Sequence, residues 1–150
     1  MIRIRPYESN DIESLTHLMG DLGYPTTVDN MKQRLKDIGS ESNTYTFVAT
    51  IDEKVAGMIG VRQVFYYEGD GCSTQVSALV TGNQYEGRGI GSALIKYVEE
   101  WAKERSSNSL YLTSGIKPER IRAHEFYKKQ GFEVNGYRFV KKLSNLNMSK

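Results

Sequence analysis

The chain has 150 residues, of which 20 are Lys or Arg and 18 are Asp or Glu, so its formal net charge is only +2. Hydrophobic residues make up 39% of the chain, and 14 glycines raise the apolar share into the range of folded globular proteins. This composition argues against disorder, a coiled coil and a strongly basic nucleic-acid-binding domain. The length predicts one domain, residues 1–143, followed by a polar tail at 144–150.

A single cysteine, Cys72, rules out a disulfide within the chain and fits a reducing compartment. Residues 1–6 alternate apolar and basic side chains and contain no long apolar core, so they predict a strand and not a signal peptide. No apolar run approaches the roughly 18–20 residues of a membrane span. We therefore expect a cytoplasmic protein with no membrane partner.

The first half of the chain predicts one strand, two helices and then three consecutive strands. The first helix follows a cap at Ser9 or Asp11 and ends near Gly20, and the second is capped by Thr27. A turn at residues 68–71 joins the second and third of the consecutive strands, which we interpret as an antiparallel meander. The predicted strands are 2–5, 45–51, 55–67 and 73–81. The predicted helices run from the cap at Ser9 or Asp11 to about Gly20, and over residues 28–38.

The second half begins with the strongest helical pattern of the chain, at residues 90–105. A short strand at 110–113 follows, then a helix that starts near Pro118 and stops at Gly131. Residues 132–134 and 137–143 predict two final strands. The order β-α-α-β-β-β-α-β-α-β-β predicts an α/β (α+β) fold with a mixed central sheet and helices on both faces.

Three glycines alternate at the start of the strongest helix, directly after a strand. Gly87, Gly89 and Gly91 allow a backbone with positive φ and a close approach to a ligand. A helix N-terminus adds unpaired N–H donors and a partial positive charge. Together these features predict a site for a phosphate or pyrophosphate. The alternative is that the glycines only tighten a turn between strand and helix.

Two familiar phosphate motifs do not fit this loop. The dinucleotide fingerprint needs its third glycine one residue later, and the P-loop needs a Gly-Lys-Ser/Thr tripeptide that the chain lacks. A metal site is not expected either, since the chain has one cysteine and two separated histidines, and His124-Glu125 is not followed by a second histidine at the spacing of a zinc helix.

A second group of residues lies on the helix that precedes Gly131. Ala123, Phe126 and Tyr127 fall on one helical face, and Gly131-Phe132 follow. From this segment alone, Tyr127 could equally be an ordinary core tyrosine.

Both segments together resemble the GNAT superfamily of acetyl-CoA-dependent N-acetyltransferases. The first is similar to the family's acyl-CoA loop, and the second to its Ala-x-x-Phe-Tyr-x-x-x-Gly-Phe helix, here residues 123–132. The similarity extends over residues 2–143. Within the family, the helix and residues 136–139 resemble small-molecule members such as aminoalkylphosphonate and aminoglycoside acetyltransferases.

The resemblance implies a role for each matching residue. Tyr127 would be catalytic, donating a proton to the departing CoA thiolate. The acetyl-CoA-binding residues would be Leu79, Val80 and Thr81 along the pantetheine arm, Gly87, Arg88, Gly89, Ile90, Gly91 and Ser92 around the pyrophosphate, and Arg120.

Two positions depart from the family pattern. Glu86 stands where the family usually has Arg or Gln, and a carboxylate beside a pyrophosphate should weaken binding unless it points away. Ala78 stands near the place where several relatives carry a glutamate as general base. The base is therefore not identified; Glu68, Asp70, Glu125 and a water chain remain open. Cys72 could in principle carry an acyl group, but no histidine is near it in sequence.

The resemblance implies direct transfer of an acetyl group from acetyl-CoA to a primary amine in a ternary complex, with CoA as product. The acceptor would be a small-molecule or peptide amine, with no nucleic-acid partner, and the resemblance allows a homodimer. The alternative is a non-catalytic module that binds or senses acyl-CoA, which Glu86 and the missing strand glutamate keep open.

Overall fold

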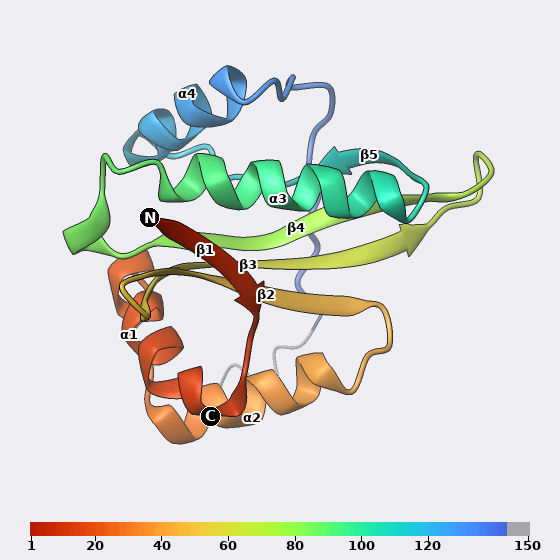
Figure 1. The fold of residues 1–150 in the computed structure, drawn as a ribbon. Coiled ribbons are helices and arrows are strands. Elements are labelled where there is room, and N and C mark those ends of the chain that lie inside the picture. The colour runs from red at the N-terminus through yellow and green to blue at the C-terminus, as the bar shows by residue number, and fades with distance from the viewer. Residues whose placement is uncertain (144–150) are drawn as a thin grey trace. The chain divides into compact units, whose positions relative to one another are not determined.

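Five strands form one mixed sheet in a computed structural model that describes residues 1–143 (Figure 1). The strand order is β1-β2-β3-β4-β5; the first four strands are antiparallel neighbours, and β5 runs parallel to β4. This confirms the α/β class, the mixed sheet and the meander. The bounds are β1 Ile2–Pro6, β2 Thr44–Ile51, β3 Lys54–Phe65, β4 Cys72–Thr81 and β5 Ser107–Tyr111.

Three helices accompany this sheet in the compact unit Met1–Leu112: α1 Ile12–Leu22, α2 Val28–Gly39 and α3 Ile90–Glu104. A short 3-10 turn at Ser9–Asp11 leads into α1, and the Thr27 hydroxyl caps α2 by accepting from Asn30 N–H at 3.1 Å, as the sequence predicts. No helix among residues 1–143 has the length and apolar character needed to cross a membrane.

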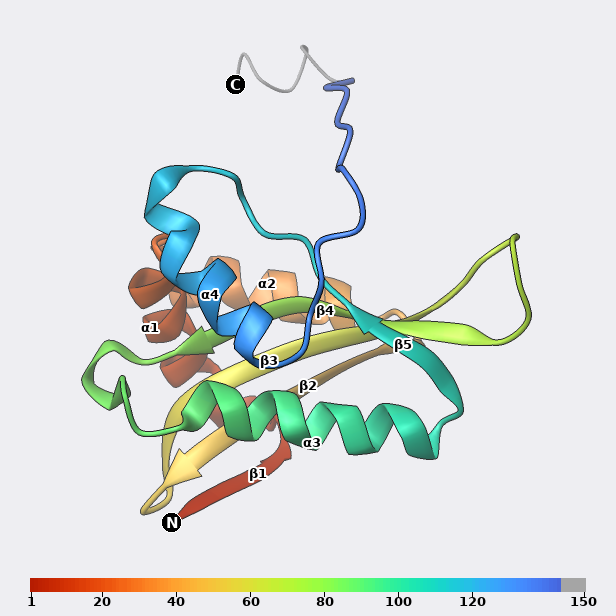
Figure 2. The same cartoon turned by 90° about the horizontal axis from the view of Figure 1, so that it is seen from above.

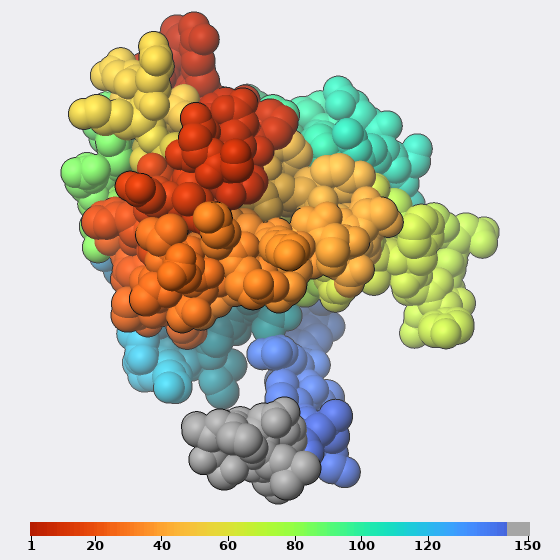
Figure 3. Space-filling model, turned by 90° about the horizontal axis from the view of Figure 1, so that it is seen from below, coloured from red at the N-terminus to blue at the C-terminus, as the bar shows by residue number. Residues whose placement is uncertain are grey.

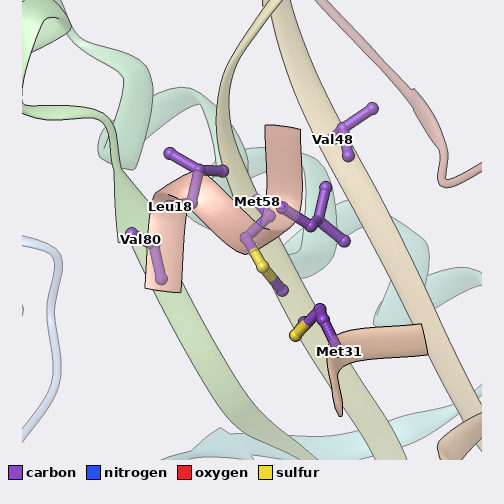
Figure 4. Close-up of a cluster of buried hydrophobic side chains, with 6 residues drawn as sticks. Leu18, Met31, Val48, Met58 and Val80 are labelled. Carbon is purple, nitrogen blue, oxygen red and sulfur yellow. The ribbon is translucent and has the colours of Figure 1, made fainter. Parts of the chain in front are cut away.

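Neighbouring residues of β3 show that helices cover both faces of this sheet. Met58 packs into a buried cluster with Leu15 of α1 and Met31 of α2 (Figure 4). A Cβ added to the preceding Gly57 would instead meet Ile90 and Leu94 of α3. Since alternate residues of a strand point to opposite faces, α1 and α2 lie on one face and α3 lies on the other (Figures 1 and 2).

The two layers of core follow from this arrangement. On the α1 and α2 side, which is seen from outside in Figure 3, the cluster also includes Leu18, Val48 and Val80. On the α3 side, Phe47 stacks edge-on against Tyr97 and Trp101, with ring centroids 5.1 and 5.9 Å apart.

The second compact unit begins at Thr113 and contains a 3-10 turn, η3 Pro118–Arg120, and the helix α4 Ile121–Lys129. Gly131 adopts φ +97° just beyond the helix, as expected for a C-terminal stop. The predicted strands at 132–134 and 137–143 are not observed, because a strand exists only when its backbone pairs with a neighbouring strand, and no strand pairing within residues 1–143 includes them. The Phe132 N–H donates instead to the Tyr127 carbonyl at the end of α4, at 3.0 Å. The predicted tail at 144–150 lies outside the described residues.

An ion pair joins β1 to the start of α1. Asp11 is only 5% exposed, and its two carboxylate oxygens accept from the Arg5 guanidinium at 2.8 and 2.9 Å. The Glu8 backbone N–H donates to the same carboxylate at 2.8 Å. The hydrogen bonds from Arg5 hold the pKa of Asp11 below its ordinary value, although burial acts in the opposite direction.

Replacing Asp11 by Asn should lower the free energy of unfolding at pH 7 by about 2 kcal/mol, since a charge-assisted pair is lost. Because the folded pKa is depressed, the carboxylate stabilises the fold above its unfolded pKa of about 4, and this contribution disappears as the pH falls through the folded value. Urea unfolding of both proteins between pH 7 and pH 2.5 measures this. A constant difference across that pH range would contradict the ionic role.

Candidate active site

β4 has a strand neighbour on both sides over only part of its length. It pairs with β3 from Cys72 to Thr81, but with β5 only through Cys72, Thr74 and Gln75. β5 ends at Tyr111, the partner of Gln75, so it lies beside only one end of β4 (Figure 1). From residue 76 onward, β4 therefore presents unpaired backbone N–H and C=O groups along its edge in the first unit.

A bulge and a buried anchor set the course of this open stretch. Gly60 pairs with Ala78 and Val61 with Val76, which leaves Ser77 as an extra residue on β4. Val80 is 3% exposed because its side chain packs among α1 and α2 residues. The backbone from Leu79 to Thr81 is thus held rigidly from one face of the sheet.

The loop after β4 is tied down at its start. The Gly82 N–H donates to the Ala56 carbonyl at 2.8 Å. The Asp21 carboxylate of α1 accepts from both the backbone and the side-chain nitrogen of Asn83, at 3.1 and 3.2 Å. The Asp21–Asn83 contacts join residues 62 apart in the sequence, and no local pattern predicted them.

The glycine loop then turns sharply into α3. Gly87 has φ +78° and Gly89 has φ +82°, and a Cβ built at either position would meet no atom within 4 Å. Gly89 is the N-cap of α3, and the first hydrogen bond at the helix start runs from Ala93 N–H to the Gly89 carbonyl at 3.0 Å. The N–H groups of Ile90 and Gly91 come before it and have no carbonyl acceptor within the helix.

The side chains around the loop leave the helix N-terminus open to an anion. No acidic residue occupies the first turn of α3. Glu86 and Arg88 are both exposed, and the Arg88 guanidinium lies 5.7 Å from the centre of the Tyr85 ring. Backbone donors, open space and the helix dipole together suit a phosphate or pyrophosphate.

Tyr127 belongs to the second unit and is held there by aromatic and polar neighbours. Its ring packs edge-on against Phe126 and Phe132, with centroids 5.5 and 5.9 Å apart. Burial raises the pKa of Tyr127 above its ordinary value, and the nearby positive charge and hydrogen bond of Arg120 offset part of that rise. The hydroxyl therefore keeps its proton at neutral pH.

Arg120 and His124 fix the segment before α4. The Arg120 guanidinium donates to the Ser114 hydroxyl at 3.4 Å, and a ring nitrogen of His124 lies 2.7 Å from the Gly115 carbonyl oxygen. Arg120 was expected at the cofactor; within its own unit it contacts Ser114 and Tyr127.

The side chains considered as general base are exposed, and the cysteine considered as acyl carrier is buried. Glu68, Asp70 and Glu125 are all exposed. Cys72 is a buried free thiol that accepts a weak contact from the Gln63 amide at 3.6 Å. Within residues 1–143, no three or more His, Cys, Asp and Glu side chains gather as a metal site would require.

A polar cleft of about 580 Å³ borders the start of the loop, and the sequence analysis missed it. It opens between α1, the turn that joins β2 to β3, and the residues just after β4. Its charged lining is mixed, with Asp11, Glu13, Asp21 and Glu53 against Arg5 and Lys54. No short sequence pattern could have shown it, since its walls come from four segments: β1, α1 with the turn before it, the turn from β2 to β3, and the residues after β4.

Known proteins are similar to this chain in sequence and in fold. An aminoalkylphosphonate N-acetyltransferase of Salmonella typhimurium is 29% identical over 126 residues, which cover 84% of this chain and 78% of that protein. The crystal structure of a GNAT family acetyltransferase of Staphylococcus aureus is 26% identical, with a TM-score of 0.81 and coverage of 95% and 98% of the two chains. An aminoglycoside acetyltransferase from an uncultured soil sample, solved with sisomicin, is 17% identical with a TM-score of 0.76, covers 95% of this chain and 97% of its own, and shows the fold alone.

The model of the acetyltransferase (GNAT) family matches residues 12–132, and the protein belongs to that family. It is accordingly an acyltransferase, and its activity is that of an N-acetyltransferase.

Replacing Gly89 by Ala should weaken CoA binding at least several-fold. A residue with a Cβ at φ +82° costs about 1–2 kcal/mol, so the loop should relax and misplace its N–H donors. Isothermal titration with CoA measures the affinity. Gly39→Ala is the matched control, because Gly39 lacks both positive φ and a neighbour within 4 Å of an added Cβ. Equal affinities for the two variants would contradict the anion-binding role of the loop.

Proposed function

We propose that the protein transfers the acetyl group of acetyl-CoA to the primary amine of a small molecule, by direct attack of the amine on the thioester. The observation that carries this proposal is the open edge of β4 leading directly into a helix N-terminus with unpaired N–H donors. The extended pantetheine arm of acetyl-CoA would match the open strand edge, and the pyrophosphate that follows it would match the helix N-terminus.

The glycine loop supports the pyrophosphate end of this assignment. The N–H groups of Ile90 and Gly91 and the dipole of the 15-residue α3 favour a negative group in front of Gly87 and Gly89. Arg88 and Ser92 are exposed at the same end of the helix and are proposed to contact the phosphates. The absence of side chains at Gly87 and Gly89 leaves room for the phosphate oxygens.

The open edge of β4 supports the thioester end. Leu79, Val80 and Thr81 offer main-chain groups that can hydrogen-bond the amides of a pantetheine arm as a neighbouring strand would. A backbone N–H near Val80 could also polarise the thioester carbonyl and stabilise the negative charge that develops on its oxygen. Acetyl-CoA supplies the activated acetyl group.

The acceptor must lose a proton before it can attack. A lysine-like amine with pKa about 10.4 is neutral in only about 1 molecule in 2,500 at pH 7, which corresponds to roughly 4.6 kcal/mol. The amine nitrogen then forms a bond to the acetyl carbon and gives up one proton to solvent, the carbon–sulfur bond breaks, and the sulfur leaves with the electron pair. We assign Tyr127 Oη as the donor that protonates this sulfur, which its raised pKa allows by keeping the phenol protonated.

The relatives guide the choice of acceptor. The curated relative from Salmonella is named for aminoalkylphosphonates, and a structural neighbour was solved with an aminoglycoside. We therefore propose a small-molecule amine over a peptide.

The proposed cytoplasmic location rests on the buried, free Cys72 and on the cytosolic supply of acetyl-CoA.

Incubation of the protein with acetyl-CoA and a panel of aminoalkylphosphonates, aminoglycosides, polyamines and peptides should release CoA thiol with at least one small-molecule class. Thiol release is measured with a chromogenic reagent, and the product by mass spectrometry. Tight CoA binding with no acetylation across the panel would instead favour the acyl-CoA-binding module.

Tyr127→Phe should lower kcat about 100-fold or more, the usual range for loss of a general acid, while the Kd for CoA changes less than two-fold. Because the pKa of Tyr127 is raised, the wild type should show no loss of kcat from this group below about pH 10. Tyr137→Phe is the control, since that tyrosine is exposed in the same unit. Unchanged turnover in Tyr127→Phe would remove Tyr127 from the acid role.

A further inference from the structure

The glycine loop between β4 and α3 has few side chains of its own to fix its position. Gly87 and Gly89 have none, and the two other side chains of the loop, at positions 86 and 88, are exposed. The position of the loop is therefore set from its two ends. At the far end, α3 is anchored by Ile90, which is 1% exposed. The near end is a 3-10 turn, η2 Asn83–Tyr85, which follows β4.

This turn is packed closely between the end of β4 and α1. The Tyr85 N–H donates to the Gly82 carbonyl at 2.9 Å and closes the turn. A Cβ added to Gly82 would come within 3.2 Å of the Tyr85 ring and 3.4 Å of Leu18 of α1. The same ring lies beneath the Arg88 guanidinium, 5.7 Å away. A displacement of the turn would therefore move the start of the glycine loop and, through Tyr85, also the side chain of Arg88.

Asp21, in the last turn of α1, binds this turn by two hydrogen bonds. Its Oδ2 accepts from the Asn83 backbone N–H at 3.1 Å, and its Oδ1 accepts from the Asn83 side-chain nitrogen at 3.2 Å. The Asp21 side chain is only 15% exposed. Hydrogen bonds to a carboxylate are stronger than neutral ones, and two of them together fix both the position and the rotation of Asn83.

The other charged neighbour of Asp21 is more distant. A ring nitrogen of His17 lies 3.8 Å from Asp21 Oδ2, and the His17 side chain is 76% exposed. Both shorter contacts of the carboxylate go to Asn83. Asp21 is therefore directed at the turn after β4 more than at an ion pair within α1.

We propose that Asp21 is a positioning residue for acetyl-CoA binding. Through Asn83 it holds the turn after β4, so that the glycine loop presents its N–H donors where the pyrophosphate needs them. This inference rests on the proposed binding of CoA at that loop. It gives α1, which supplies none of the proposed cofactor-contacting residues, a part in the affinity for the cofactor.

The physical basis of this role is preorganisation. A loop that already holds its binding position does not have to be ordered when the ligand arrives, so less of the binding free energy is lost. The apparent affinity falls in proportion to the fraction of molecules in which the loop is correctly placed. Releasing Asn83 should therefore weaken CoA binding without removing any group that touches CoA.

Asp21→Asn keeps the shape of the side chain but places an amide NH₂ where one oxygen now accepts a hydrogen bond. We expect the Kd for CoA, measured by isothermal titration, to rise about five-fold. Asn83→Asp should raise it at least as much, because two carboxylates would then face each other. Glu13→Gln is the matched control, since it removes a carboxylate from the same helix and the same cleft, and it should leave the Kd within about two-fold of the wild-type value.

Exchanging the two side chains separates positioning from a general loss of stability. In the double variant Asp21→Asn with Asn83→Asp, the amide at position 21 can donate to the carboxylate at position 83, and its oxygen can still accept from the backbone N–H. The Kd for CoA should return to within about two-fold of the wild-type value. In Asp21→Asn without CoA, hydrogen exchange should quicken at the amides of residues 83–89, while the amides of α3 beyond its first turn stay protected.

The possible results distinguish this inference from the proposed function. A wild-type protein that binds no CoA would overturn both. Wild-type binding with an unchanged Kd in Asp21→Asn would overturn the role of Asp21 alone. A weakened Asp21→Asn that the double variant does not restore, or in which α3 loses its protection together with the loop, would make Asp21 a structural residue only and would also overturn the proposal.

Discussion

The unequal pairing of β4 is the constraint on which the proposed site depends. β3 supports β4 along its full length, while β5 accompanies only its first residues. A fully paired strand would have no free backbone to offer, and an unsupported one would have no fixed position. β4 has a supported side and an open side, and the buried Val80 keeps the open stretch from shifting.

The position of α3 follows from the same strand. A Cβ at Gly57 of β3 would come within 2.7 Å of both the Val80 carbonyl oxygen and an Ile90 methyl, so only glycine lets the start of α3 approach β3 and the end of β4 this closely. Asp21 holds the intervening loop from α1. The two parts of the proposed acetyl-CoA site, an open strand edge and a helix N-terminus, thereby lie in one compact unit.

The net charge of the chain does not reveal an anion-binding site that is built from backbone groups. The net charge of +2 argued against a nucleic-acid-binding protein, yet it is compatible with an anionic ligand, because the proposed donors are backbone N–H groups and a helix end. Glu86, the departure from the family pattern, is exposed beside the loop, and solvent and Arg88 can reduce its repulsion. The single cysteine, Cys72, is buried at the start of β4, which does not favour a role as acyl carrier.

Sequence alone determined the elements whose signals are local. The caps, the turn at 68–71, the periodic α3 and the three alternating glycines predicted most helices and strands within a few residues, and the loop-and-helix pattern predicted the family. Tertiary structure decided the contacts that join distant segments: the point where β5 leaves β4, the Asp21–Asn83 bridge and the cleft beside it. The strands predicted at 132–134 and 137–143 show the reason most clearly. The side-chain pattern indicates that a segment favours an extended backbone. A strand also needs a neighbouring strand to hydrogen-bond its backbone, and the local sequence does not specify where that neighbour lies.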